Sequence, residues 1–271
     1  MNRPNHVAPK TLLETLPHDR AESYLNHCSG NSASASALYL WGMDMAAALH
    51  EVLSMTEVAV RGAIAAQLQS FAKSHGVTTG EWIKEKDSLP HLSELRFANG
   101  RPLFDHASLR RMSRKQEGGR TRMHPRSQAS TSHGDLIAQV MFGTWGAMLP
   151  DKNDSRPQSV QEAINSLWRE ALQEAFPHRI TTIRRFTAPQ TIGDHVRVSA
   201  TLRNRVNHVD SLLNVDVESY LEKTIAPLLQ AIGPEIKQVI MAQSRVLAVW
   251  QRRTVPLIGP GLNIKQISRN H

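Results

Sequence analysis

The chain has 271 residues, 40% of them hydrophobic, which is enough to bury a substantial core, and its length allows one large domain or two small ones. Its 32 Lys and Arg residues against 24 Asp and Glu give a net charge of +8, which favours a polyanionic partner because clustered cations displace counterions from phosphates. Cys28 is the only cysteine, so an internal disulfide and a site built from several thiolates, such as a zinc finger, are excluded.

Composition leaves the partner and the location partly open. The charge does not separate RNA from DNA or anionic lipid, and a basic surface that only maintains solubility is the simpler alternative. No apolar run approaches the length of a membrane span, and residues 1–10 lack the apolar stretch of a secretory signal. We therefore expect a cytoplasmic protein without membrane association.

The first half of the chain is predicted to be built around one long helix. Residues 37–74 contain no proline and place apolar side chains three, four or seven positions apart, which is helical spacing. Residues 29–36 are small and polar, and we expect them to form a loop that supplies the N-cap. Residues 136–149 are rich in apolar side chains and end at Pro150, so they predict a buried helix.

The second half of the chain also predicts helices. One is expected to begin with the capping-box pattern of Ser159 and Glu162. Others are expected over residues 195–208, 216–232 and 234–253, where the apolar spacing is approximately helical. No pair of partner strands is evident, so the chain predicts an all-α fold.

The domain organisation follows from these helices and from one shift in composition. We predict a single helical domain over residues 1–253 and a tail over residues 254–271, which contains several Pro and Gly residues. Within the domain, residues 105–133 form a basic insertion, expected to be a helix followed by a mobile loop. Its basic side chains are candidates for contacts with RNA phosphates, and a solvated surface loop is the alternative. They are Arg110, Arg111, Arg114, Lys115, Arg120, Arg122 and Arg126.

The residues that suggest chemistry lie late in the chain, in the run 202–208. Arg203, Asn204 and His208 interrupt an apolar helical pattern there. An imidazole, which ordinarily titrates near about pH 6.5, can take the proton of a ribose 2′-hydroxyl, and a guanidinium can neutralise charge that develops on a phosphate. These residue types suit cleavage of a phosphodiester without a metal ion or another cofactor.

Helical geometry limits how this run can work. Asn204 and His208 are four residues apart and share a face of a helix, so the amide can orient the imidazole. Arg203 and His208 are five residues apart, about 140° around the helix axis. For both to reach one phosphate, the site needs a helix end, the full length of the Arg side chain, or a second copy of the chain.

The run resembles the motif of the HEPN ribonucleases, in which Arg is followed by a polar residue and then, after four to six intervening residues, by His. Three segments also resemble the Abi-like branch of this superfamily, the AbiD/AbiF-type abortive-infection proteins, and occur in the same order. They are residues 53–64, with Glu57 and Arg61 one turn apart; Phe142-Gly143-Thr144-Trp145; and residues 202–213. The likeness extends over residues 12–232, most of the chain.

The resemblance implies a HEPN-type helical bundle with additional helices, a homodimer whose motifs face one another, and a metal-independent endoribonuclease acting in phage defence or as a toxin. It assigns His208 as general base or acid, Arg203 as the group that stabilises the phosphate, and Asn204 as the group that orients. The products would carry 2′,3′-cyclic phosphate and 5′-hydroxyl ends, and an antitoxin or a phage-derived trigger would be a further partner. The residues expected to support the site are Glu57, Arg61, Asn207 and Asp210.

Two departures from the family's pattern keep a second interpretation open. Family members often follow the first-helix Arg with Asn, where this chain has Gly62. They often follow the motif His with a His-Glu pair, where this chain has Val209 and Asp210. Asp210 can replace that Glu, or the site is altered. The alternative is a HEPN-fold RNA-binding or regulatory protein that does not cleave.

Several of these residues also have simpler explanations. Glu57 and Arg61 fit an ordinary ion pair one helical turn apart. Phe142 and Trp145 lie among apolar residues and are expected to be core side chains rather than platforms for stacked bases. The 13 histidines include no pair with the spacing and carboxylates of a metal-hydrolase motif, and no glycine-rich nucleotide-binding run is present, so we expect no metal and no nucleotide cofactor.

Overall fold

The protein is predominantly helical. The computed structural model describes residues 9–105, 107–110, 112–113, 131–179 and 189–253. The described residues are 67% helical and form no β-strand, only an isolated bridge between Arg96 and Pro102. The predicted all-α class is confirmed. Within the same residues, no helix has both the length and the apolar character needed to cross a bilayer.

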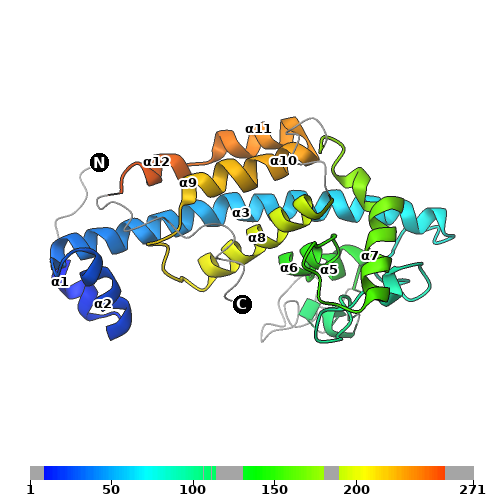
Figure 1. The fold of residues 1–271 in the computed structure, drawn as a ribbon, viewed down its shortest axis with the longest axis horizontal. Helices are drawn as coiled ribbons and strands as arrows, with labels where there is room; N and C mark the ends of the chain where they lie inside the picture. The colour runs from blue at the N-terminus through cyan, green and yellow to red at the C-terminus, as the bar shows by residue number, and fades with distance from the viewer. Residues whose placement is uncertain (1–8, 106, 111, 114–130, 180–188, 254–271) are drawn as a thin grey trace.

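Helix α3 (Ser32–Ser74) is the long axis of the fold, as Figure 1 shows. Its 43 residues extend about 65 Å at the usual helical rise. Asn31 caps its start by accepting a hydrogen bond from a first-turn backbone N–H, and Gly76, with φ of +90°, closes its end. The predicted helix is confirmed, but it starts before residue 37. Residues 32–36, expected in a loop, form its first turn because Asn31 supplies the cap.

Short helices flank the two ends of α3. Helices α1 (Pro9–Glu14) and α2 (His18–His27) pack against its N-terminal part. The elements around its C-terminal half are η1 (Leu92–Glu94), α5 (His133–Ala138), α6 (Phe142–Ala147), α7 (Gln158–Glu170) and the 3-10 turn η2 (Leu172–Ala175).

Two local predictions in this region are wrong. The single helix expected over residues 136–149 is two helices, α5 and α6, and the capping box belongs to α5, where Ser132 and Asp135 exchange hydrogen bonds. Helix α7 starts directly after Pro157, and the Ser159 hydroxyl caps nothing. Proline before the first helical residue fixes φ and sets the start two residues earlier than the Ser159 pattern.

The last third of the chain returns along α3. It contains α8 (Pro189–Asn207), α9 (Val217–Tyr220), the π-helical turn η3 (Leu221–Ile225), α10 (Ala226–Ile232), α11 (Pro234–Gln243) and α12 (Val246–Trp250). The segment 216–232 is helical as predicted. The helix predicted over residues 234–253 breaks at Ser244, where Arg245 turns onto α3 and donates a 2.6 Å hydrogen bond to Asp44.

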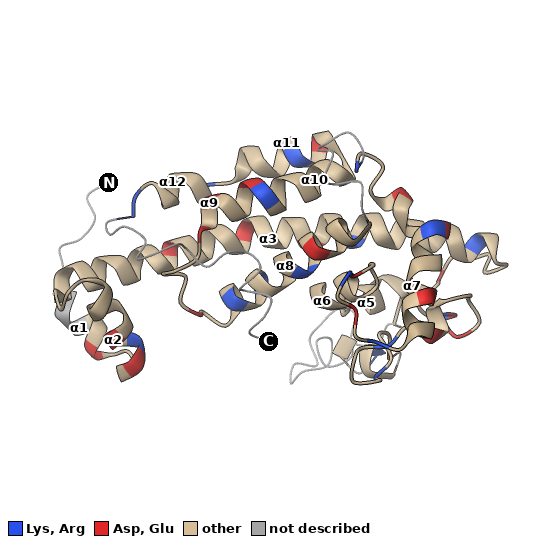
Figure 2. Cartoon of the chain, in the orientation of Figure 1, with Lys and Arg blue, Asp and Glu red and all other residues tan. Residues whose placement is uncertain are grey.

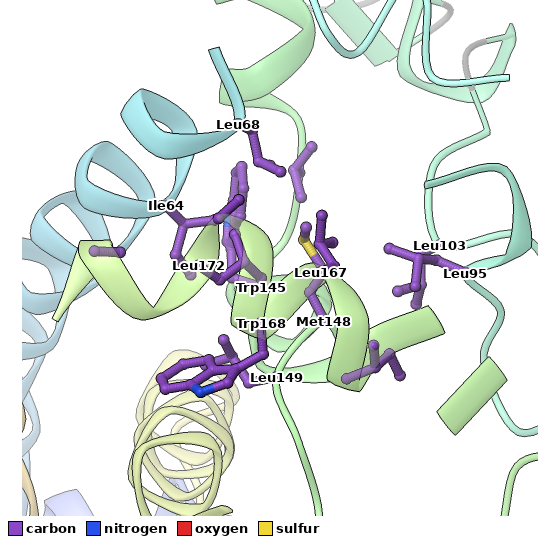
Figure 3. Close-up of a cluster of buried hydrophobic side chains, with 14 of the residues drawn as sticks. Ile64, Leu68, Leu95, Leu103, Trp145, Met148, Leu149, Leu167, Trp168 and Leu172 are labelled. Carbon is purple, nitrogen blue, oxygen red and sulfur yellow. The ribbon is translucent and has the colours of Figure 1, made fainter. Parts of the chain in front are cut away.

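Two apolar clusters hold these helices together, and α3 and α8 contribute to both. One joins the C-terminal half of α3 with α6, α7 and the first half of α8, as the interleaved side chains of Ile64, Leu68, Trp145 and Leu167 show in Figure 3. The other joins the N-terminal half of α3 with α9 to α12 and with Val198, Leu202 and Val206 of α8. The register of α8 against α3 is therefore fixed from both sides.

Arg197 anchors the first half of α8 to the end of α6. Its guanidinium donates to the carbonyl oxygens of Gly146, Leu149 and Pro150 at 3.1 to 3.3 Å and pairs with Asp151 and Asp194. The Leu149 and Pro150 carbonyls lie past the end of α6, and Arg197 supplies donors to both. Gly193 allows the close approach, because a Cβ there would lie 2.4 Å from the Pro150 carbonyl oxygen.

Gly193→Ala is expected to lower the free energy of unfolding by about 1–3 kcal/mol, because the added methyl group must push α6 and α8 apart. Gly143→Ala, on α6, is the matched control, since a Cβ there meets nothing within 4 Å. It should leave stability within about 0.5 kcal/mol of wild type. Urea unfolding of the two variants measures the difference, and equal midpoints would contradict the close contact.

Candidate functional site

The predicted site residues meet where α3 and α8 run antiparallel. Glu57 Oε2 of α3 lies 3.2 Å from Arg203 Nε of α8, and two turns earlier on α3 the His50 Nδ1 lies 3.0 Å from Asn207 Oδ1. Ser54 lies between them on the same face and is 3.5 Å from His50 Nε2. We call these five residues the α3–α8 seam. Segments about 150 residues apart in the sequence are thus brought together.

The Glu57–Arg203 ion pair is the strongest contact of the seam. The Glu57 side chain is only 11% exposed and that of Arg203 is 29% exposed, so both charges are largely removed from water. A buried carboxylate needs a partner, and Arg203 supplies it. The Arg203 guanidinium also lies 3.4 Å from the Asn204 amide oxygen. Glu57, Arg203 and Asn204 are therefore neighbours, as the predicted roles require.

Arg61 does not form an ion pair with Glu57, which was the simpler alternative to a role in supporting the site. Within the described residues, Arg61 makes no hydrogen bond or ion pair, and its side chain is half-buried one turn beyond Glu57. The i,i+4 ion pair was the simpler explanation of these two residues, and it is wrong because Glu57 turns toward α8. Arg61 is left with a guanidinium that can bind a further group.

His208 lies at the C-terminal end of α8. Its backbone N–H donates to the Asn204 carbonyl at 2.9 Å, and its side chain is exposed. The next residue, Val209, has φ of +56°, and the Asp210 N–H donates back to the Arg205 carbonyl at 2.9 Å. This is a Schellman motif in which His208 is the C-cap. Asp210 contributes through its backbone, and its carboxylate faces solvent.

Arg203 and His208 are held in different ways within one protomer. Arg203 is held against α3, whereas His208 extends past the last turn of α8, and within the described residues no hydrogen bond or ion pair joins them. The separation of about 140° expected from an ideal helix is kept because α8 is regular up to Asn207.

No role is predicted from the sequence for His50 or Ser54. A signal was present, since His50, Ser54 and Glu57 are spaced four and three residues apart and so share one face of a helix. It was overlooked because only the tertiary packing shows that this face meets Asn207. Another histidine of α8, His195, is a contrasting case: burial lowers its pKa to about 4, so its imidazole is uncharged at neutral pH.

The remaining predicted residues lie apart from the seam. Phe142 and Trp145 are almost fully buried in the apolar core, so their assignment as core residues is confirmed. Arg110 is exposed. Arg111, Arg114, Lys115, Arg120, Arg122 and Arg126 fall outside the described residues.

The described part of the chain is not basic. Of the 32 Lys and Arg residues, 11 fall outside it, and of the 24 Asp and Glu residues only Glu117 does, which leaves 21 basic and 23 acidic side chains. Figure 2 shows the two kinds interspersed along the helices. The net positive charge of the protein therefore resides in the segments beyond the described residues.

A cavity of about 90 Å³ lies between residues 97–112 and 139–144 and is lined by none of the predicted catalytic residues. Among the described residues, His18, Asp19 and Glu22 are close enough to share a metal ion, but all three are exposed on α2.

Comparison of the chain with protein-family models, with curated protein sequences and with solved structures finds no match.

Val209 adopts a left-handed backbone that a β-branched residue tolerates poorly. Val209→Gly is expected to raise the free energy of unfolding by about 0.5–1 kcal/mol, because glycine adopts this φ without a clash. Gly76→Val, at the equivalent position after α3, is the reverse substitution and serves as the control. It should lower the free energy of unfolding by about 1 kcal/mol or more. Chemical denaturation measures both. A destabilised Val209→Gly would mean that Val209 is not strained.

Proposed function

We propose that the protein is a metal-independent endoribonuclease of the HEPN type, acting in the cytoplasm in phage defence by abortive infection or as a toxin. The observation that carries the proposal is the ion pair between Glu57 and Arg203. It joins the two segments that resemble the Abi-like proteins, although they lie far apart in the chain. A chance match of short motifs gives no reason for them to meet.

The chemistry assigns a role to each group. Glu57 holds Arg203 through Nε and Nη1 lies beside the Asn204 amide oxygen, so Nη2 is the guanidinium nitrogen assigned to bind a phosphate. Asn204 lies beside that guanidinium and orients the substrate or the imidazole. His208 transfers a proton to or from the reacting oxygens. Asn207 and Asp210 support the end of α8 that carries His208.

We propose that the active form is a homodimer. Arg203 is held against α3 whereas His208 caps the end of α8, and a second copy would let Arg203 of one chain and His208 of the other act on one phosphate. A stripe of α3 supports such an interface: Leu40, Ala47, Val58 and Gly62 share one exposed face, and Leu40 and Val58 are 57% and 55% exposed. The exposed, side-chain-free Gly62 permits close approach of a partner helix.

The basic segment at residues 105–133 supplies the affinity for RNA in this proposal. The described residues carry more acidic than basic side chains, so attraction to phosphates depends on the cations outside them. An antitoxin or a phage-derived trigger would regulate the enzyme.

The alternative, an RNA-binding or regulatory protein that does not cleave, is favoured by the strained Val209 at the position after His208. It is also favoured by the lack of contact between Arg203 and His208 within the described residues of one protomer. Cleavage assays separate the two candidates.

The purified protein is expected to cleave RNA in EDTA and to leave 2′,3′-cyclic phosphate and 5′-hydroxyl ends. His208→Ala and Arg203→Ala should each lower the rate by at least about 10²-fold, because each removes a group that acts in the transition state. Gel analysis with end-specific labelling measures the products. Asp19→Ala, on the distant α2, is the control. RNA binding without scission would favour the non-cleaving alternative.

A mixing experiment tests the shared site. Arg203→Ala and His208→Ala protein, each inactive alone, are unfolded together and refolded as a mixture. If Arg203 of one copy acts with His208 of the other, half of the dimers are mixed and each has one intact site, so about a quarter of wild-type activity returns. A mixture as inactive as its components would place both residues of the site in one protomer.

A further inference from the structure

His50 is a member of the α3–α8 seam to which neither the sequence nor the proposed mechanism gives a role. It lies on α3, two turns before Glu57, and its imidazole is exposed. Its Nδ1 is 3.0 Å from the Asn207 amide oxygen, and Asn207 directly precedes His208. Two histidines thus flank one asparagine at the end of α8.

The contact with Asn207 fixes the protonation pattern of the His50 ring. An amide oxygen only accepts hydrogen bonds, so Nδ1 carries the proton that is donated. In the neutral ring the lone pair is then on Nε2. Ser54 Oγ approaches Nε2 at 3.5 Å, the limit of a hydrogen bond, and competes only weakly for it. An imidazole oriented through one nitrogen, with the other available, is the arrangement of a general base.

The reaction needs two proton transfers. Attack by a ribose 2′-hydroxyl requires a base to remove its proton, and departure of the 5′ oxygen requires an acid to protonate it. His208 can perform one of these steps at a time. Within the described residues, its ring makes no side-chain hydrogen bond that would orient it, whereas the ring of His50 is oriented.

We propose that His50 is the general base of the reaction and that His208 is the general acid. The inference rests on the proposed endoribonuclease function. It assigns His50, on the same protomer as the phosphate-binding Arg203, to the first proton transfer, and His208 of the second copy to the other.

The step balances without a metal ion or another reactant. Nε2 of neutral His50 takes the 2′-hydroxyl proton while the 2′ oxygen forms a bond to phosphorus. The bond from phosphorus to the 5′ oxygen breaks, and protonated His208 gives its proton to that oxygen. The products are a 2′,3′-cyclic phosphate and a 5′-hydroxyl, and proton exchange with water restores both imidazoles.

The charges near His50 come from three elements. On α3, Glu51 is engaged by Arg245, 3.6 Å away, and Glu57 is paired with Arg203 of α8. Beyond α8 lie His208 and the exposed Asp210. Because both nearby α3 carboxylates have cationic partners, the Asn207 amide is the group that sets the orientation of His50.

A purely structural role for His50 is the rival explanation. The chain offers a matched pair: the His27 Nε2, at the end of α2, lies 3.2 Å from the Asn214 amide oxygen. His50 contacts Asn207 at the end of α8, and His27 contacts Asn214 in the segment that follows α8. His27 is outside the seam. Loss of a structural cross-link should have similar effects at both positions.

The experiment measures kcat for RNA cleavage against pH in the full-length wild type, His50→Ala, His50→Gln and His27→Ala, with thermal unfolding of each. Both His50 variants should lower kcat by at least about 10²-fold with KM and the unfolding temperature nearly unchanged, and His27→Ala should match wild type. Glutamine keeps an N–H that can reach Asn207 but transfers no proton. Activity retained in His50→Gln would therefore overturn the assignment.

The pH profile identifies the base. The wild-type profile should be bell-shaped, and the decline on its acidic side should disappear in His50→Ala, because a general base must be unprotonated to act. In His208→Ala the decline on the alkaline side should disappear instead. An unchanged acidic limb in the residual activity of His50→Ala would contradict the proposal.

A substrate with an altered leaving group separates the two histidines. RNA with one 5′-bridging sulfur has a leaving group that departs without protonation, so it should restore cleavage by His208→Ala and not by His50→Ala. Restoration of His50→Ala would make His50 the acid and overturn the proposal.

If the wild type cleaves and His208→Ala does not, while His50→Ala is fully active, this inference alone fails. If the wild type cleaves no RNA, the proposed function fails with it.

Discussion

The packing of α8 against α3 through the Glu57–Arg203 ion pair organises the candidate site. A carboxylate that is only 11% exposed is costly unless a cation meets it, and Arg203 of α8 meets Glu57. The ion pair therefore favours the same register of α8 on α3 as the apolar contacts on both sides. The position of Asn207 beside His50 follows from the same register.

At the end of α8, a helix held by side-chain contacts is followed by a strained backbone at Val209. Arg197 fixes the beginning of the helix to three carbonyl groups of the α6 end, and the seam fixes its last two turns. Beyond them, His208 is held by its backbone alone, and Val209 takes a conformation that glycine takes at the end of α3. A rigid helix thus presents an exposed histidine at a fixed end, which is a suitable arrangement for a group that must meet a substrate or a second copy.

The excess of basic residues and the candidate site residues lie in different parts of the chain. The helices of the described residues carry slightly more acidic than basic side chains, and the excess of cations lies in the segments outside them. Within the proposed function, nonspecific attraction to RNA and the chemical step would therefore depend on different parts of the protein. Such a division allows affinity to change with salt while the Glu57–Arg203 ion pair, which is largely removed from water, keeps its geometry.

The helical class, the long helix through residues 37–74 and the core assignment of Phe142 and Trp145 are predictable from the amino-acid sequence, because helical spacing of apolar residues is a local property. The same patterns single out Glu57 and Arg203, with an ion pair between Glu57 and Arg61 as the simpler alternative. That Glu57 meets Arg203 and that His50 meets Asn207 is visible only in the tertiary structure. These contacts join residues about 150 positions apart, and periodicity within one helix contains no information about which face of another helix will meet it.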